Sequence, residues 1–203
     1  METFGIQGSG ILPGDFPLLA QVNKLYSDAL GAIDLGNFRV IFTQTEDGRP
    51  DTLYPESSNV QITTVRLTSA VGNLGWNHFP LQTAKYYGHE LFHVYQRLKW
   101  HGEDFGNNWN DWEPLHPFAH AASLAVLFRI DPPAGISCKE QVEYLQGEIS
   151  PKYPEYSGGG EIASQNDWDL AKIQSAYEAE YRTLISAQNS LPNNNQVVDT
   201  SNN

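Results

Sequence analysis

The chain has 203 residues, a length that fits one domain and allows a sizeable core without disulfide or metal staples. Its formal net charge of −12, from 24 acidic and 12 basic residues, argues against nucleic acid or an anionic membrane surface as the main partner. A single cysteine rules out an internal disulfide, and no apolar stretch approaches the length of a membrane span.

The first part of the chain predicts one helix and a small sheet. Residues 1–17 read as an irregular lead-in, rich in glycine and proline and without the basic and apolar segments of an export signal. Residues 18–30 carry apolar side chains at helical spacing and end near Gly31, so we expect a helix there. Residues 38–43 and 60–67 are rich in β-branched side chains and predict two strands of a mixed sheet, with turn chemistry at 47–50.

Residues 83–100 contain no proline and predict an amphipathic helix. Its apolar stripe consists of Leu91, Val94, Tyr95 and Leu98. The polar side chains His89, Glu90, His93 and Gln96 fall on the other side. The two histidines therefore lie outside the stripe that an ordinary core residue would occupy.

The stretch His89-Glu90-Leu91-Phe92-His93 is typical of a zinc site on a helix. His89 and His93 are one turn apart on the same face, so both rings can reach one metal ion. Glu90 flanks them and can act as a general base toward a metal-bound water.

The second half of the chain predicts further helices. Residues 101–117 form a polar, aromatic loop, and 119–130 form an almost wholly apolar helix that should be buried. A capping box at 137–140 predicts a helix to about residue 147, and Ser164 is expected to cap a long helix at about 167–188. Residues 189–203 are polar and asparagine-rich, which predicts a disordered tail after a domain spanning 18–188.

Catalytic zinc usually has three protein ligands and an open position for water, so a third ligand is needed. The last helix offers two candidates, Glu178 and Glu180. Helical phase favours Glu180, which shares a stripe with apolar neighbours, whereas Glu178 lies on a face of small residues. The next candidates are Glu161, Asp167 and Asp169.

The segment Gly88-His-Glu-Leu-Phe-His-Val-Tyr-Gln96 resembles the His-Glu-Leu-x-His-Val-x-Gln signature of bacterial zincin domains within the gluzincin metallopeptidases. Such domains occur in or near polymorphic toxins and secretion-system cargo. The resemblance implies an α+β zincin-like fold, with a small sheet on the motif helix and additional C-terminal helices. It also implies zinc held by His89, His93 and Glu178. Many gluzincins have an aspartate four residues after the ligand glutamate, where this chain has Arg182.

The resemblance implies a zinc-dependent endopeptidase that acts as a toxin or effector domain. Its substrate would be a polypeptide, its partner a cognate immunity or inhibitor protein, and its route a specialised delivery or secretion system. A catalytically silent zincin that serves as a binding or structural module of a secretion particle is the alternative. An intact Glu90 argues against a silent binder.

A peptidase also needs a donor for the oxyanion that forms at the scissile carbonyl. The candidates are Tyr177, Tyr181, His116 and His120. His116 and His120 are themselves spaced i, i+4 and could ligate a metal. Pro117 between them allows at most a helix start there.

Overall fold

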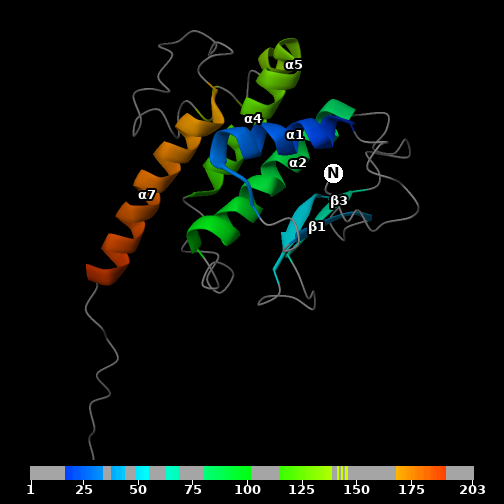
Figure 1. Ribbon diagram of the computed structural model, residues 1–203. Helices are drawn as coiled ribbons and strands as arrows, with labels where there is room; N and C mark the ends of the chain where they lie inside the picture. Colours follow the sequence, from blue (N-terminus) through cyan, green and yellow to red (C-terminus); the bar gives the residue numbers. More distant parts are fainter. Residues whose placement is uncertain are drawn as a thin grey trace, which may run out of the picture.

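The structure is a computed structural model, and it describes residues 17–33, 38–43, 49–54, 63–68, 80–101, 115–138, 141, 143, 145 and 168–190. The protein is α+β, mostly helical, with a small three-stranded mixed sheet at one side of the helices (Figure 1). This confirms the predicted class. Most of the predicted lead-in and nearly all of the predicted tail lie outside the described residues.

The chain runs from one helix through three strands into the remaining helices. In order, the elements are α1 (Pro17–Leu30), β1 (Phe38–Thr43), β2 (Asp51–Leu53), β3 (Thr63–Thr68), α2 (Pro80–Tyr95), the π-helix η5 (Gln96–His101), α4 (His116–Ile130), α5 (Pro132–Ser137) and α7 (Leu170–Ser190). Within the described ranges, no helix is long and apolar enough to cross a membrane.

The predicted first helix is confirmed as α1, which buries Leu19, Val22 and Tyr26 at helical spacing. The helix ends at Leu30. The next residue, Gly31, has a φ of 85°, a conformation that glycine adopts without steric cost. The Gly31 amide closes the last turn by donating to the Ser27 carbonyl at 3.0 Å.

The sheet has the strand order β1-β3-β2, with β3 parallel to β1 and antiparallel to β2. Both predicted strands are present, although β3 begins at Thr63. Strand β2 was not predicted, because three residues after a turn are too short to show an alternating pattern. An ion pair between Asp51 and Arg66 holds β2 to the sheet, with Arg66 Nε 2.7 Å from Asp51 Oδ1.

Helix α2 is the centre of the molecule, because it contacts β2, β3, α1 and α4. Its buried residues include Leu91, Val94 and Tyr95, as the sequence predicts. The prediction is wrong for the fourth member of the stripe, Leu98, because its side chain is 38% exposed. The cause is η5, where i→i+5 hydrogen bonding widens the turn and shifts later residues out of α-helical phase.

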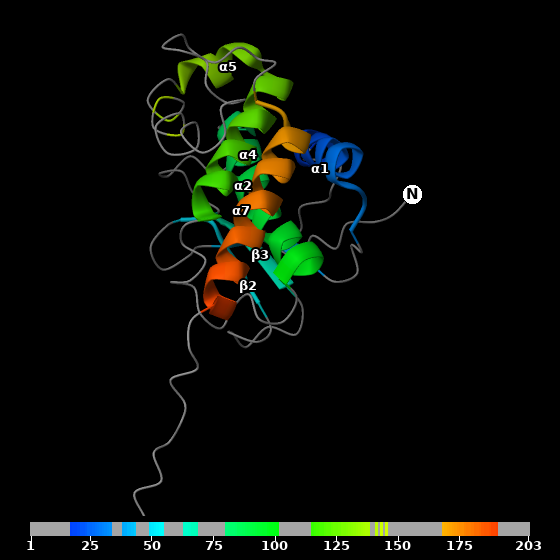
Figure 2. The same ribbon diagram turned by 90° about the vertical axis from the view of Figure 1, so that its left-hand side faces the viewer.

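The predicted buried helix is confirmed as α4, although it begins three residues earlier, at His116, with Pro117 in its first turn. Its own apolar side chains lie on all sides of the helix, and it runs beside α7 (Figure 2). Asp131 follows the last residue of α4. Its side chain accepts a hydrogen bond from the Ala134 amide and so caps the start of α5. Helix α7 starts at Leu170, and the Asp169 carboxylate just before it accepts hydrogen bonds from the amides of Ala171 and Lys172. The predicted cap Ser164 lies outside the described residues.

Gly88 sets how closely α2 approaches α4. A Cβ at this position would lie 2.9 Å from Val126 Cγ2, which is too close for a β-branched side chain of fixed rotamer in a core. The main chain at Gly88 is also tied to α1, because the Tyr26 hydroxyl donates to the Gly88 carbonyl. The glycine just before the motif therefore lets the histidine helix lie directly against α4.

Replacing Gly88 with alanine should destabilise the fold by about 1 kcal/mol, because overpacking costs about 1–3 kcal/mol and alanine returns up to about 1 kcal/mol of helix propensity. Chemical denaturation of the metal-free protein measures the loss. In a Val126→Ala background the clash disappears, so there Gly88→Ala should be neutral or stabilising. An equal loss in both backgrounds would contradict the close approach.

Candidate metal centre

Three histidines converge where α2 packs on α4. His89 and His93 lie one turn apart on α2, and His116 is the first residue of α4. One ring nitrogen from each lies within 4.8 Å of the others. His89 Nε2 is 3.2 Å from His93 Nε2 and 3.2 Å from His116 Nε2. These three side chains lie close enough together to hold a metal ion.

The spacing of the nitrogens suits tetrahedral coordination. Two imidazole nitrogens at the usual zinc distance of about 2.0–2.1 Å lie about 3.3 Å apart when the geometry is tetrahedral. The two separations of 3.2 Å at His89 are close to this value. The His93 and His116 nitrogens lie within 4.8 Å of each other, so this third separation determines how far the rings would have to move to bind one ion.

The protonation of the cluster also suits a metal, because a ligand imidazole must be neutral. Desolvation, followed by the nearby rings of His93, His120 and His116, lowers the pKa of His89 well below its ordinary value. Desolvation lowers the pKa of His93 to about 3, although its hydrogen bond to Gln96 acts in the opposite direction. Both rings are therefore neutral at physiological pH and have a lone pair to donate.

Gln96 fixes which nitrogen of His93 faces the cluster. His93 Nδ1 lies 2.5 Å from Gln96 Oε1, and an amide oxygen can only accept, so Nδ1 carries the proton. The lone pair is then on Nε2, the atom that faces His89. The Gln96 side chain also hydrogen-bonds the Tyr177 hydroxyl, and both residues are buried. The sequence placed Gln96 on the motif face, but its partners depend on tertiary packing.

Glu90, which follows His89 on α2, is buried and faces the sheet. Its Oε2 accepts a hydrogen bond from Thr52 Oγ1 of β2 at 2.6 Å. Desolvation raises the pKa of Glu90 to about 7, the Thr52 hydrogen bond opposes this, and Asp51 adds to it. A second contact to the motif helix comes from Tyr54, the residue after β2, whose hydroxyl donates to the His93 carbonyl at 3.3 Å. Sequence reasoning missed Thr52, since it missed β2 itself.

His120 completes a ring of four imidazoles. It follows His116 by one turn of α4 and is half-buried. Its ring centroid is 4.5 Å from that of His89 and 4.8 Å from that of His116. Desolvation lowers its pKa to about 4, and the charges of His116 and Lys85 act in the same direction. The i, i+4 pair noted in the sequence therefore faces the pair in the motif.

The glutamates predicted as the third ligand do not belong to the three-histidine group. Glu178 accepts from Gln174 at 2.6 Å and pairs with Arg182 at 3.5 Å, both on its own helix. Arg182, which stands where an aspartate was expected, is thus a partner of Glu178. Glu180 is half-buried on the same helix. Ligation by either glutamate stays a prediction, and His116 is the third nitrogen donor that the geometry supplies.

The other predicted site residues fall in different places. Tyr177 is buried, contacts the Phe92 ring at 5.4 Å between centroids, and is connected to the cluster through Gln96. Tyr181 is half-buried and stacks on Tyr177. Asp169 caps α7, whereas Glu161 and Asp167 lie outside the described residues. Helix α7 therefore meets the motif helix through an aromatic side chain.

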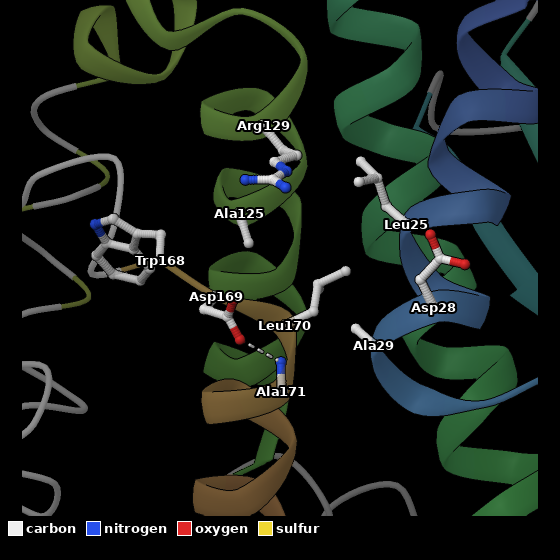
Figure 3. Close-up of a pocket in the computed structure, with 9 residues that line it drawn as sticks. All are labelled: Leu25, Asp28, Ala29, Ala125, Arg129, Trp168, Asp169, Leu170 and Ala171. Atoms are coloured by element: carbon white, nitrogen blue, oxygen red, sulfur yellow. Dashed lines mark hydrogen bonds between the residues drawn. The ribbon is translucent and has the colours of Figure 1, made fainter.

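A cavity of about 330 Å³ lies apart from this centre, between α1, α4 and the start of α7 (Figure 3). Leu25, Ala125 and Leu170 line it with apolar side chains, and Arg129 and Trp168 also border it. None of the four clustered histidines lines it.

The chain matches no protein-family model, no curated protein and no solved structure. The chemistry of the centre therefore rests on its own residues. Three convergent imidazoles, a fourth beside them and a buried carboxylate with a raised pKa are the groups that a function has to explain.

Proposed function

We propose that the protein is a zinc-dependent endopeptidase with a zincin-like fold, and that it acts as a toxin or effector domain. The observation that carries the proposal is the convergence of His89, His93 and His116 next to Glu90, which lies at the correct offset on the same helix. The small sheet beside the motif helix and the helices that follow it are in keeping with such a fold.

Zinc is the metal that best fits the donor set. Neutral imidazoles suit zinc and other late transition metals, whereas magnesium and calcium require oxygen ligands. Three protein ligands also leave one coordination position for water or substrate, which is the arrangement of catalytic zinc. When bound, zinc would polarise the scissile carbonyl and lower the pKa of the attacking water.

The residues of the chain then supply the proton transfers. Glu90 removes the proton of the attacking water and delivers it to the leaving amine. In the metal-free protein its pKa is about 7, in the range where a carboxyl group can both accept and donate a proton at neutral pH. Thr52 holds one carboxylate oxygen toward β2 and so orients the base.

Strand β2 is a suitable place for a polypeptide substrate. Among the described strands it pairs with β3 on one side only, and it lies directly beside Glu90. An extended peptide can add to such an edge by main-chain hydrogen bonds. Among the predicted oxyanion donors, His120 lies within the imidazole cluster, whereas Tyr177 already hydrogen-bonds Gln96.

The proposed toxin role, the cognate immunity or inhibitor protein and the specialised delivery system rest on the resemblance of the motif. The alternative is a structural metal module of a secretion particle. One observation favours that alternative: four imidazoles gather at the site, and closed four-ligand zinc sites are structural.

Metal removal tests the proposal. The purified protein should carry about one zinc ion per chain, measured by atomic emission, and should cleave an unfolded protein such as denatured casein. A chelator should abolish cleavage, and added zinc should restore it. His89→Ala and His93→Ala should lose tight zinc binding, whereas Gln82→Ala, on an exposed part of the same helix, should keep it. Unchanged metal content in both histidine variants would refute the proposed site.

A further inference from the structure

We propose that His120 is a fourth, exchangeable protein ligand, so that the metal is closed by four imidazoles at rest and opens when His120 leaves. The inference rests on the metal site of the proposed function. It adds a resting state in which substrate must displace a side chain of the protein.

Each of the two helices carries two histidines at the site, and this arrangement suggests a fourth ligand. His89 and His93 on α2, and His116 and His120 on α4, are each spaced i, i+4, so each pair projects from one face of its helix. The ring centroids of the three close histidines are 4.9, 5.0 and 5.4 Å apart. The His120 ring is 4.5 Å from His89 and 4.8 Å from His116, so it is at least as close to them.

His120 differs from the other three in where its nitrogens lie, because they are outside the group that converges within 4.8 Å. Its side chain is half-buried, as are those of His89 and His116. Its main chain is fixed within α4, where the Ser123 hydroxyl donates to the His120 carbonyl at 2.7 Å. A change of side-chain rotamer alone can therefore move a ring nitrogen toward or away from the metal position. The two states need no movement of the helices.

The exchange has a direct chemical consequence. With His120 bound, four nitrogen donors fill a tetrahedral shell and no position remains for water. A carbonyl oxygen or an anion that enters must replace the His120 nitrogen. The closed state therefore has little hydrolytic activity, and an arriving ligand creates the open position that it uses.

Cobalt(II) in place of zinc tests this, because its visible spectrum reports coordination and azide probes an open position. The proteins to compare are wild type, His120→Phe, which keeps a ring without a nitrogen, and Lys85→Gln, which removes the neighbouring charge without removing a donor. If the closed state outweighs the open one by about tenfold, azide should bind His120→Phe about tenfold more tightly than wild type. His120→Phe should also bind cobalt more weakly, and Lys85→Gln should match wild type in both respects.

Equal azide affinities and spectra in wild type and His120→Phe would overturn the inference while leaving the three-histidine site intact. If wild type binds no cobalt, the proposed metal site itself fails, so the two failures are distinguishable. His120→Ala should repeat the result, which guards against a folding defect in the phenylalanine variant; thermal melting of the metal-free proteins checks the fold. A matching change in Lys85→Gln would assign the effect to charge and contradict ligation.

Discussion

Glu90→Gln is expected to lower the rate of peptide hydrolysis by about 10²–10⁴-fold or more, because it removes the general base and leaves every imidazole donor in place. Zinc content should remain at the wild-type value. The glutamine keeps an oxygen that can accept the Thr52 hydrogen bond, so the local structure should persist. Cleavage of an unfolded protein and metal analysis of the same sample provide the two measurements.

Stability against pH gives a control for Glu90→Gln that does not depend on activity. The folded pKa of Glu90, about 7, lies above the ordinary value of 4.5, so above pH 4.5 the unfolded chain loses a proton that the folded chain keeps. The contribution of this group to stability therefore falls as the pH rises from 4.5 to 7, and it stays low above that. The metal-free variant should be more stable than wild type at pH 8 and similar to it at pH 4.

Glu178→Gln is the matched variant, since it makes the same chemical change on a glutamate paired within α7. It should leave hydrolysis nearly unchanged. If wild type is toxic when expressed in cells, Glu90→Gln should be tolerated and Glu178→Gln should not. Equal hydrolysis by wild type and Glu90→Gln would remove Glu90 from the mechanism.

The third ligand gives the other large expected effect. His116→Ala should weaken zinc binding by more than about 100-fold, because loss of a residue that only orients a ligand costs about 10–100-fold and loss of a ligand should cost more. Glu178→Ala and Glu180→Ala should have little effect, since neither carboxylate belongs to the converging group. Competition with a coloured chelator measures all three affinities.

The reverse order would restore the ligand set implied by the family resemblance. If Glu178→Ala weakened zinc binding strongly and His116→Ala weakened it only slightly, α7 would have to lie nearer to the motif helix when metal is bound. A severe Glu180→Ala would instead support the helical-phase argument. Gln96→Leu offers an internal standard, because Gln96 orients His93 without reaching the metal, and its loss should fall in the range of about 10–100-fold.

What the sequence predicted well is local. The i, i+4 spacing of His89 and His93 and the neighbouring Glu90 are set by residues a few positions apart. The apolar composition of α4 likewise predicted its burial. Such features follow from helical geometry, which a short sequence window contains.

What the sequence did not predict depends on tertiary contacts. His116 was one of several candidates, and only the packing of α4 on α2 brings it to His89. Thr52 was missed because β2 owes its existence to β3 and to the Asp51–Arg66 pair. For His116 and Thr52 a contact between distant segments decides the outcome, and no periodic pattern records it. Leu98 was misplaced because the residues around it do not indicate a π-helix.

The residues of the centre come from segments far apart in the chain, and this has a consequence for how the centre forms. Thr52 lies 38 residues from Glu90, and His116 lies 27 residues from His89, so loops must close before these groups meet. An extended chain therefore carries the motif without its third imidazole or its oriented base. Unfolding would therefore disperse the centre, and refolding would restore it without any cleavage of the chain.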